Sequence, residues 1–263
     1  MAGLAACGTA PTNQAQAPEP PLHFARVAAD PVRHGERLAR VLGCIGCHGE
    51  DLTGQDWSEP GFGSLWTANL TRVVPRYDDA ALARTITSGV RPDGRELWEM
   101  PSHLFTQLAD PDMAALLAYL RSRPPAGPER PPPLFEAGAR REIEAGTFTS
   151  SAAQVRAEGS QSPPEVPGDH RLARYIVRAT CAECHRMNLR GGQPNPEATP
   201  RPDLRMVAAY PAAEFRRLLR TGIAAGNREV GMMGDVARGR YSHLTEAEVD
   251  AIYAYLRALG SQP

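Results

Sequence analysis

Amphipathic helical segments occur in the same order in the two halves of the chain. Residues 35–41 and 171–177 alternate apolar residues with arginines at helical spacing, and residues 82–90 and 215–223 are short helical runs that each end near a glycine. A glycine directly after the last periodic residue is typical of a helix C-terminus. The pattern therefore predicts that the chain contains two copies of one helical unit.

Each repeat closes on a helix that ends in the sequence Ala-Tyr-Leu. In the first repeat we expect Asp110 to be the N-cap, with Pro111 at the first helical position. In the second repeat Thr245 and Glu248 have the spacing of a capping box. Both closing helices are therefore well marked at their starts.

The same pentapeptide pattern, C-x-x-C-H, stands near the start of both repeats. Its residues are Cys44, Cys47 and His48 in the first, and Cys181, Cys184 and His185 in the second. This pattern matches covalent attachment of c-type haem, although C-x-x-C also occurs in zinc sites and redox dithiols. Haem is favoured because 75 residues separate Cys44 from Tyr119 and 74 separate Cys181 from Tyr255, so each motif opens a unit of the same size.

On these motifs the chain resembles the bacterial di-haem class I c-type cytochromes, and it is similar to cytochrome subunits of periplasmic dehydrogenases. The resemblance implies an all-α fold of two tandem cytochrome c domains joined by a Pro-rich linker, with one covalently bound haem c in each domain. It also implies that His48 and His185 are the proximal iron ligands. In this family the first and last helices of a domain cross through a small residue and an aromatic one, here Gly35 against Tyr119 and, less perfectly, Ala173 against Tyr255.

The resemblance places the distal ligand, a methionine, between the glycine stop and the last helix. In the first half this is Met100. In the second half two adjacent methionines fit, Met232 and Met233, and Met233 is favoured because it stands before a small residue. We expect Met113 and Met206 to fill the core instead.

The identity of the two axial ligands decides the function of a haem protein. An iron held by histidine and methionine has a raised reduction potential, and it has no free coordination position. We therefore expect an electron-transfer protein that is not itself an enzyme, accepting electrons from a dehydrogenase and passing them to a terminal oxidase or another cytochrome. The alternative is an enzyme similar to the di-haem cytochrome c peroxidases, which need one open distal site. His103 and His243 are the residues that could displace the methionines.

The segment between the repeats is rich in proline. Residues 123–133 cannot continue a helix and are expected to form an extended spacer. The following chain contains a short helical pattern around residues 136–145 and is expected to drape over the domains. The expected organisation is a flexible tether over residues 1–23, a first domain over 24–123, a linker and connector over 124–168, and a second domain over 169–263.

Charge is nearly balanced, at −1 overall, but the two halves differ in sign. Residues 24–125 carry 11 arginines and 13 acidic residues, and residues 169–263 carry 14 arginines and 10 acidic residues. All 29 basic residues are arginines, which we interpret as a compositional bias rather than a sign of nucleic-acid binding. Opposed charges could still guide an encounter with redox protein partners.

The N-terminal sequence around Cys7 resembles a bacterial lipobox. Covalent haem attachment takes place outside the cytoplasm in bacteria of this type, so we expect a periplasmic protein made from a longer precursor. Cys7 is then the candidate lipidation site, and a lipid anchor there is the only membrane attachment we expect. No stretch of the sequence is long and apolar enough for a transmembrane helix.

Overall fold

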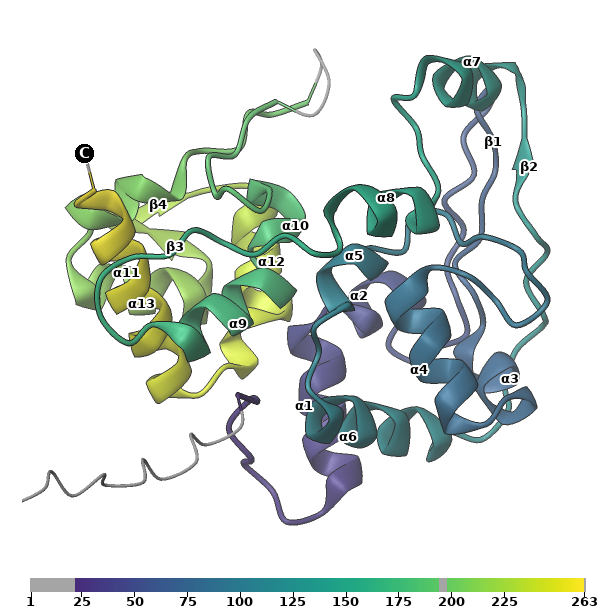
Figure 1. Cartoon of the computed structure of the whole chain (residues 1–263), viewed down its shortest axis with the longest axis horizontal. Helices are drawn as coiled ribbons and strands as arrows, with labels where there is room; N and C mark the ends of the chain where they lie inside the picture. Colours follow the sequence, from purple (N-terminus) through teal and green to yellow (C-terminus); the bar gives the residue numbers. More distant parts are fainter. Residues whose placement is uncertain (1–21, 194–197, 263) are drawn as a thin grey trace, which may run out of the picture.

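Helices form most of both halves in the computed structural model, which describes residues 22–193 and 198–262 (Figure 1). Cys7 lies outside the described residues. The first half contains α1 (Pro31–Val41), α2 (Cys44–His48), β1 (Gly63–Ser64), α3 (Leu70–Val73), η1 (Val74–Arg76), α4 (Asp79–Ser88), α5 (Ser102–Phe105) and α6 (Asp110–Arg121). The connector contains β2 (Leu134–Phe135), α7 (Ala137–Ala145) and α8 (Ser151–Glu158). The second half contains α9 (Arg171–Ala179), α10 (Ala182–His185), η2 (Leu204–Ala209), α11 (Ala212–Thr221), β3 (Ile223–Ala224), η3 (Ala225–Asn227), β4 (Arg228–Glu229), α12 (Met232–Gly239), η4 (Tyr241–His243) and α13 (Glu246–Gly260).

The first and last helices of each half pack against each other, α1 on α6 and α9 on α13. Gly35 makes the close approach of α1 and α6 possible, because a Cβ at that position would lie 1.9 Å from the carbonyl oxygen of Ala115 and 2.8 Å from the Cβ of Tyr119. The predicted contact between Gly35 and Tyr119 is confirmed. In the second half Ala173 and Tyr255 are both buried.

The predicted helix ends are mostly confirmed. Gly89 and Gly222 stop α4 and α11 in the left-handed conformation, with φ of 70° and 77°. The capping box of Thr245 and Glu248 starts α13. The prediction for α6 is wrong, since the N-cap is Ala109 and Asp110 is already helical. The side chain of Ala109 cannot cap the helix, and its own N–H donates to the hydroxyl of Tyr175 at 3.0 Å.

The Pro-rich segment packs on the first half rather than forming a free spacer. The Asn69 amide donates to the carbonyls of Ala126 and Pro128, both at 2.8 Å. The Arg130 guanidinium donates to the backbone carbonyls of residues 53 and 54 and lies 4.2 Å from the centre of the Trp66 ring. Proline lacks an N–H, so side chains make most of the contacts that hold this segment: they donate to its carbonyl oxygens or, in the case of Arg130, to those of the first half.

The connector continues by covering one edge of the first half. β2 pairs with β1 in antiparallel register, Gly63 opposite Phe135. Four aromatic rings, those of Phe62, Trp98, Phe135 and Phe148, pack together near this strand pair, with centroids of contacting rings 4.7 to 6.0 Å apart. The helix predicted around residues 136–145 is confirmed as α7, whereas α8 was not predicted.

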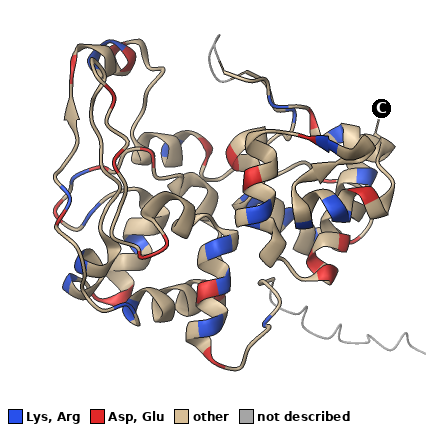
Figure 2. Ribbon diagram, turned by 180° about the vertical axis from the view of Figure 1, so that it is seen from behind, with Lys and Arg blue, Asp and Glu red and all other residues tan. Residues whose placement is uncertain are grey.

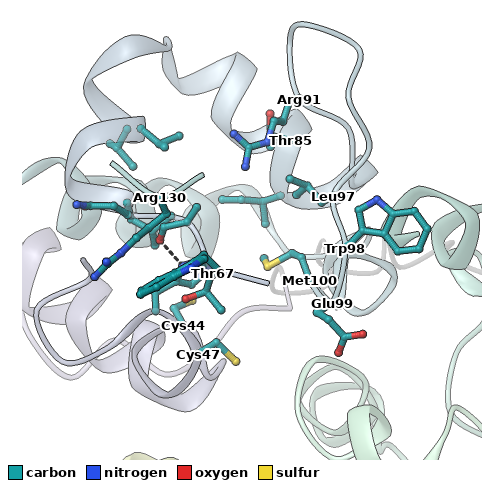
Figure 3. Close-up of a pocket in the computed structure, with 18 of the residues that line it drawn as sticks. Cys44, Cys47, Thr67, Thr85, Arg91, Leu97, Trp98, Glu99, Met100 and Arg130 are labelled. Atoms are coloured by element: carbon teal, nitrogen blue, oxygen red, sulfur yellow. Dashed lines mark hydrogen bonds between the residues drawn. The ribbon is translucent and has the colours of Figure 1, made fainter. Parts of the chain in front are cut away.

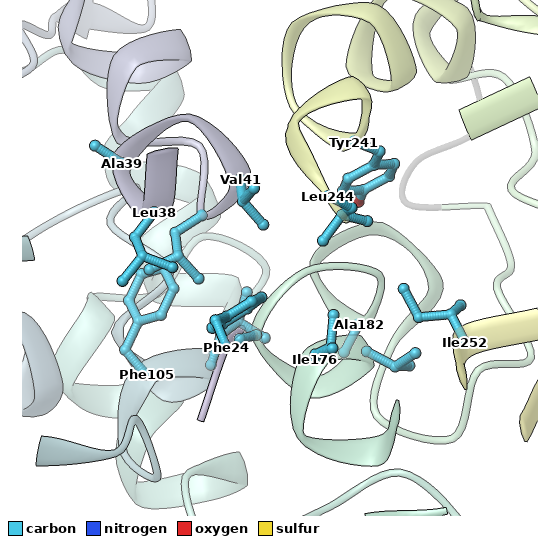
Figure 4. Packing of buried hydrophobic residues seen from close by; sticks show 14 of the residues in the cluster. Phe24, Leu38, Ala39, Val41, Phe105, Ile176, Ala182, Tyr241, Leu244 and Ile252 are labelled. Carbon is cyan, nitrogen blue, oxygen red and sulfur yellow. The ribbon is translucent and has the colours of Figure 1, made fainter. Parts of the chain in front are cut away.

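The two halves share one cluster of buried hydrophobic residues. Phe24 is fully buried between them, and its ring centroid lies 5.6 Å from that of Tyr175 (Figure 4). Polar contacts also cross the interface. Arg37 of α1 makes an ion pair with Glu248 of α13 at 2.9 Å, and Arg178 of α9 donates to the carbonyl of His103 at 2.8 Å. Basic and acidic residues are interspersed on the ribbons of both halves (Figure 2).

Candidate haem sites

A cavity of about 600 Å³ lies beside the first C-x-x-C-H motif. Cys44, Cys47, His48 and Met100 all line it. Much of its wall is apolar, including Leu70, Val74, Leu82, Ile86, Leu116 and Leu120. Small-molecule and cofactor pockets are typically about 300–1,000 Å³ and mostly apolar, so the volume and lining fit a large planar cofactor.

The His48 ring is held by a hydrogen bond that fixes its tautomer. Its Nδ1 lies 2.8 Å from the carbonyl oxygen of Ala68. Because a carbonyl can only accept, the proton is on Nδ1, and Nε2 keeps the lone pair that a metal ligand needs. Burial lowers the pKa of His48, which favours the neutral form that can bind iron.

The two cysteines of this motif are free thiols one helical turn apart on α2. Burial raises the pKa of Cys44 to about 12. Since the thiolate is the species that binds zinc or attacks a disulfide, this environment does not favour either role. No group of three or more His, Cys, Asp or Glu side chains that could hold a metal ion occurs within residues 22–193 and 198–262.

Met100 reaches the same cavity from a loop that begins at the Gly89 stop. The Leu97 N–H donates to the Gly89 carbonyl at 2.7 Å, which ties this loop to the end of α4. Glu99 takes a positive φ of 61°, and the Met100 sulfur points into the pocket (Figure 3). His103, the candidate to displace it, does not line the cavity.

The second motif repeats this local geometry. His185 is buried and its Nδ1 lies 2.8 Å from the carbonyl oxygen of Pro202, so its Nε2 is also left as the free nitrogen. The backbone around the two histidines matches as well. The His48 carbonyl accepts from the Gly54 N–H at 2.8 Å, and the His185 carbonyl accepts from the Gly191 N–H at 3.0 Å. Both motifs therefore hold their histidine in the same way.

The methionines of the second half differ in exposure. Met232 is 69% exposed, whereas Met233 is partly buried and packs against the hydrophobic core. Of the two methionines predicted to fill the core, Met113 is buried, but the prediction for Met206 is wrong because that side chain is 44% exposed. Met206 lies in the short 3₁₀ segment η2, whose tight turn directs Val207 inward instead.

Two parts of the first cavity wall were not predicted. Glu183, from the second motif, lines the cavity of the first half. Residues 129–133 of the Pro-rich segment form another part of the wall, beside Trp66. The sequence carries no local signal for either contact, because each depends on how distant segments pack.

The comparisons with known proteins agree with this geometry. The family model for cytochrome c matches residues 32–124 and 173–260. The chain is 24% identical over 258 residues to the fructose dehydrogenase cytochrome subunit of Gluconobacter japonicus, covering 87% of this chain and 52% of that protein. It is 24% identical over 270 residues to the cytochrome c subunit of the quinone alcohol dehydrogenase of Gluconacetobacter polyoxogenes, covering 88% and 56%. It is 25% identical over 287 residues to the gluconate 2-dehydrogenase cytochrome c subunit of Pantoea cypripedii, covering 92% and 63%.

The fold and the two motifs define a protein that binds two haems covalently, one through each C-x-x-C pair. The chain belongs to the cytochrome c family, with two matching segments and two haem c sites. It spans only a little over half the length of the dehydrogenase subunits it matches. Among the described helices, none has the length and apolar character needed to cross a bilayer.

Proposed function

We propose that this protein is a di-haem relay that carries electrons and catalyses no substrate reaction of its own. The observation that supports the proposal is the cavity of the first half, which is lined by both His48, whose Nδ1 is held by the Ala68 carbonyl, and Met100. In the second half we assign His185 and Met233 the same roles, because Met233 is the less exposed of the two adjacent methionines.

When bound, the haem supplies an iron that gains and loses one electron at a time. The chain's own residues do the rest. The carbonyls of Ala68 and Pro202 keep the two histidines in the tautomer that leaves Nε2 free. Met100 and Met233 would each supply a second protein ligand to an iron held there, which would keep peroxide and other small ligands from it.

The proposed partners follow from the names of the relatives. Three of them are cytochrome subunits of dehydrogenases, so we assign this chain a dehydrogenase as electron donor and a terminal oxidase or another cytochrome as acceptor. Because covalent haem attachment takes place outside the bacterial cytoplasm, we place the protein in the periplasm, with Cys7 as the candidate lipid anchor.

For the organisation of the chain we propose two domains over residues 24–123 and 169–263, with a tether before them and a Pro-rich linker and connector between them. The two segments that match the family model support this division, since both lie almost entirely within the proposed domains.

The test compares three methionine variants of the purified holoprotein. Met100→Ala and Met233→Ala should each remove about half of the near-infrared thioether-to-iron band of the ferric protein, as expected when one of two equivalent irons loses its sulfur ligand. Met232→Ala is the matched control and should leave the band unchanged, because that side chain is exposed.

Haem stoichiometry and peroxide turnover are measured on the same samples. Two low-spin haems per chain and no peroxide consumption support the relay. One high-spin haem in the unmodified holoprotein, together with peroxide consumption, would identify a peroxidase-like enzyme instead.

A further inference from the structure

Arg240 lies at the end of α12, between the two haem attachment motifs. Its side chain is only 12% exposed, and its Nε donates to the Val41 carbonyl of the first half at 3.2 Å. The guanidinium lies over Gly43, where an added Cβ would be 2.8 Å from the Arg240 Cζ. Gly43 directly precedes Cys44, so Arg240 contacts the loop that attaches the first haem.

The same guanidinium also contacts the second attachment motif. Its Nη1 donates to the carboxylate of Glu183 at 2.6 Å. Glu183 stands between Cys181 and Cys184 in α10, and it also lines the cavity of the first half. One side chain therefore joins the turn before Cys44 to the short helix that carries the second motif.

The geometry of this contact needs an arginine. A guanidinium is planar and presents donors in several directions, whereas an ammonium on a flexible stem is a point charge. Gly43 provides the space, because any side chain there would collide with the guanidinium and would also have to adopt the observed φ of +85°. The Nη2 atom is buried and has no hydrogen-bond partner among residues 22–193 and 198–262.

We propose that Arg240 is a positioning residue for electron exchange between the two haems, holding the two attachment motifs together. This inference rests on the relay function proposed above. In the exchange one electron leaves a ferrous iron, which becomes ferric, and reduces the ferric iron of the other site. No bond forms or breaks, and no further oxidant or reductant is needed.

The charge of Arg240 has a second consequence that can be measured separately. A cation that contacts both attachment motifs would disfavour the more positive ferric state of an iron held beside them, so it would raise both reduction potentials. Arg240→Gln removes both the charge and the double contact. Arg240→Lys keeps the charge but not the planar fork, so it separates the two effects.

The experiment measures two quantities on wild type and variants with equal haem content. Spectroelectrochemical titration gives both reduction potentials. Exchange spectroscopy of the haem methyl resonances of the half-reduced holoprotein gives the rate of electron exchange, and dilution separates exchange within a molecule from exchange between molecules. Arg37→Gln is the matched control. Arg37 lies in the same interface between the halves and pairs with Glu248, and its side chain contacts neither attachment motif.

We expect Arg240→Gln to slow the exchange within the molecule several-fold and to lower both potentials. Arg240→Lys should slow the exchange but leave the potentials close to those of wild type, and Arg37→Gln should leave the exchange rate unchanged. The role of Arg240 would be overturned if Arg240→Gln exchanged electrons at the wild-type rate, or if Arg37→Gln slowed the exchange as much as Arg240→Gln does. Either result would leave the proposed relay function intact. If the unmodified holoprotein shows no exchange within the molecule, the relay function fails as well.

Discussion

At the scale of single residues, the crossing of α1 and α6 in the first half depends on the absence of a side chain at Gly35. A methyl group there would have to displace the backbone of Ala115, which lies in the middle of α6 and cannot move without the helix. We expect Gly35→Ala to lower the free energy of unfolding by about 1–3 kcal/mol, as overpacking usually does.

Gly239 provides the control for this substitution. It lies in α12 with nothing within 4 Å of an added Cβ. Gly239→Ala should raise the free energy of unfolding by about 0.5 kcal/mol, since it restricts only the unfolded chain. Chemical denaturation of both variants measures the two changes in the free energy of unfolding. If Gly35→Ala left the free energy of unfolding unchanged, the close crossing of α1 and α6 would be contradicted.

Asp112 is a residue whose burial makes stability depend on pH. Its carboxylate is 1% exposed, accepts from the Tyr175 hydroxyl at 2.6 Å and the Phe24 N–H at 3.0 Å, and lies 3.9 Å from the His34 ring. Burial raises the pKa of Asp112. A carboxyl with a raised pKa in the folded protein favours folding most when it is protonated, so its contribution is lost as the pH rises through that pKa.

Asp112→Asn should remove this dependence, because one amide oxygen can accept both hydrogen bonds without a charge. The stability of the variant relative to wild type should therefore increase from pH 4 toward neutrality, as measured by denaturation at a series of pH values. Asp110→Asn, at an exposed position of the same helix, is the control. A difference that shrinks as the pH rises would contradict the assigned sign.

At the scale of elements, the start of α13 is tied to the first half through Glu248. Its carboxylate completes the capping box with Thr245, pairs with both Nη atoms of Arg37, and accepts from the Ala25 N–H. Burial alone would raise the pKa of Glu248, but the ion pair and the backbone donors outweigh burial and lower it. Its contribution to stability is thus present at neutral pH and is lost as the pH falls through the lowered pKa.

Removing one partner of this buried ion pair leaves the other uncompensated. We expect Glu248→Gln to destabilise the holoprotein by about 3–5 kcal/mol at neutral pH. Glu246→Gln, at an exposed position in the first turn of the same helix, should change stability little. Equal effects of the two substitutions would show that the ion pair between Glu248 and Arg37 contributes nothing measurable to stability.

Local chemistry in the sequence was enough to predict several elements. The glycine stops at Gly89 and Gly222 and the capping box of α13 each depend on residues at the ends of one helix, whereas the crossing at Gly35 was predicted from the family resemblance. The contacts that the sequence could not reveal are those between distant segments. Arg37 and Glu248 are 211 positions apart, and no sequence pattern around either residue indicates that the two form an ion pair.

The same distinction applies to the haem sites. The five residues of each C-x-x-C-H motif carry their own chemistry, so they could be read directly. Glu183 in the wall of the first cavity could not, because its placement needs both halves to be docked. The helix α8 was missed because its start is marked only by Ser150, whose hydroxyl accepts from the Ala153 N–H within a Ser- and Pro-rich stretch.

At the scale of the whole molecule, the shared core predicts that the two halves unfold together. Phe24 is fully buried between them, and Arg178 fixes α9 to the carbonyls of α5. We expect the holoprotein to show a single thermal transition, because neither half keeps its packing when the other unfolds.

Phe24→Ala should weaken this coupling and cost about 3–5 kcal/mol, the usual range for a buried aromatic residue. Its control is Phe148→Ala, which removes a ring from the aromatic cluster of the connector, away from the contact between the halves. Calorimetry should resolve two transitions in Phe24→Ala and one in Phe148→Ala. Two transitions in wild type would show that the halves are independent.

The Pro-rich wall separates enclosure of the first site from attachment to it. Residues 129–133 follow Cys44, Cys47 and Met100 in the chain, yet they close one side of the cavity those residues line. A chain that ended before residue 129 would carry both cysteines and the methionine but would lack that side of the cavity. The Pro-rich wall therefore encloses the first site and supplies none of its attachment groups.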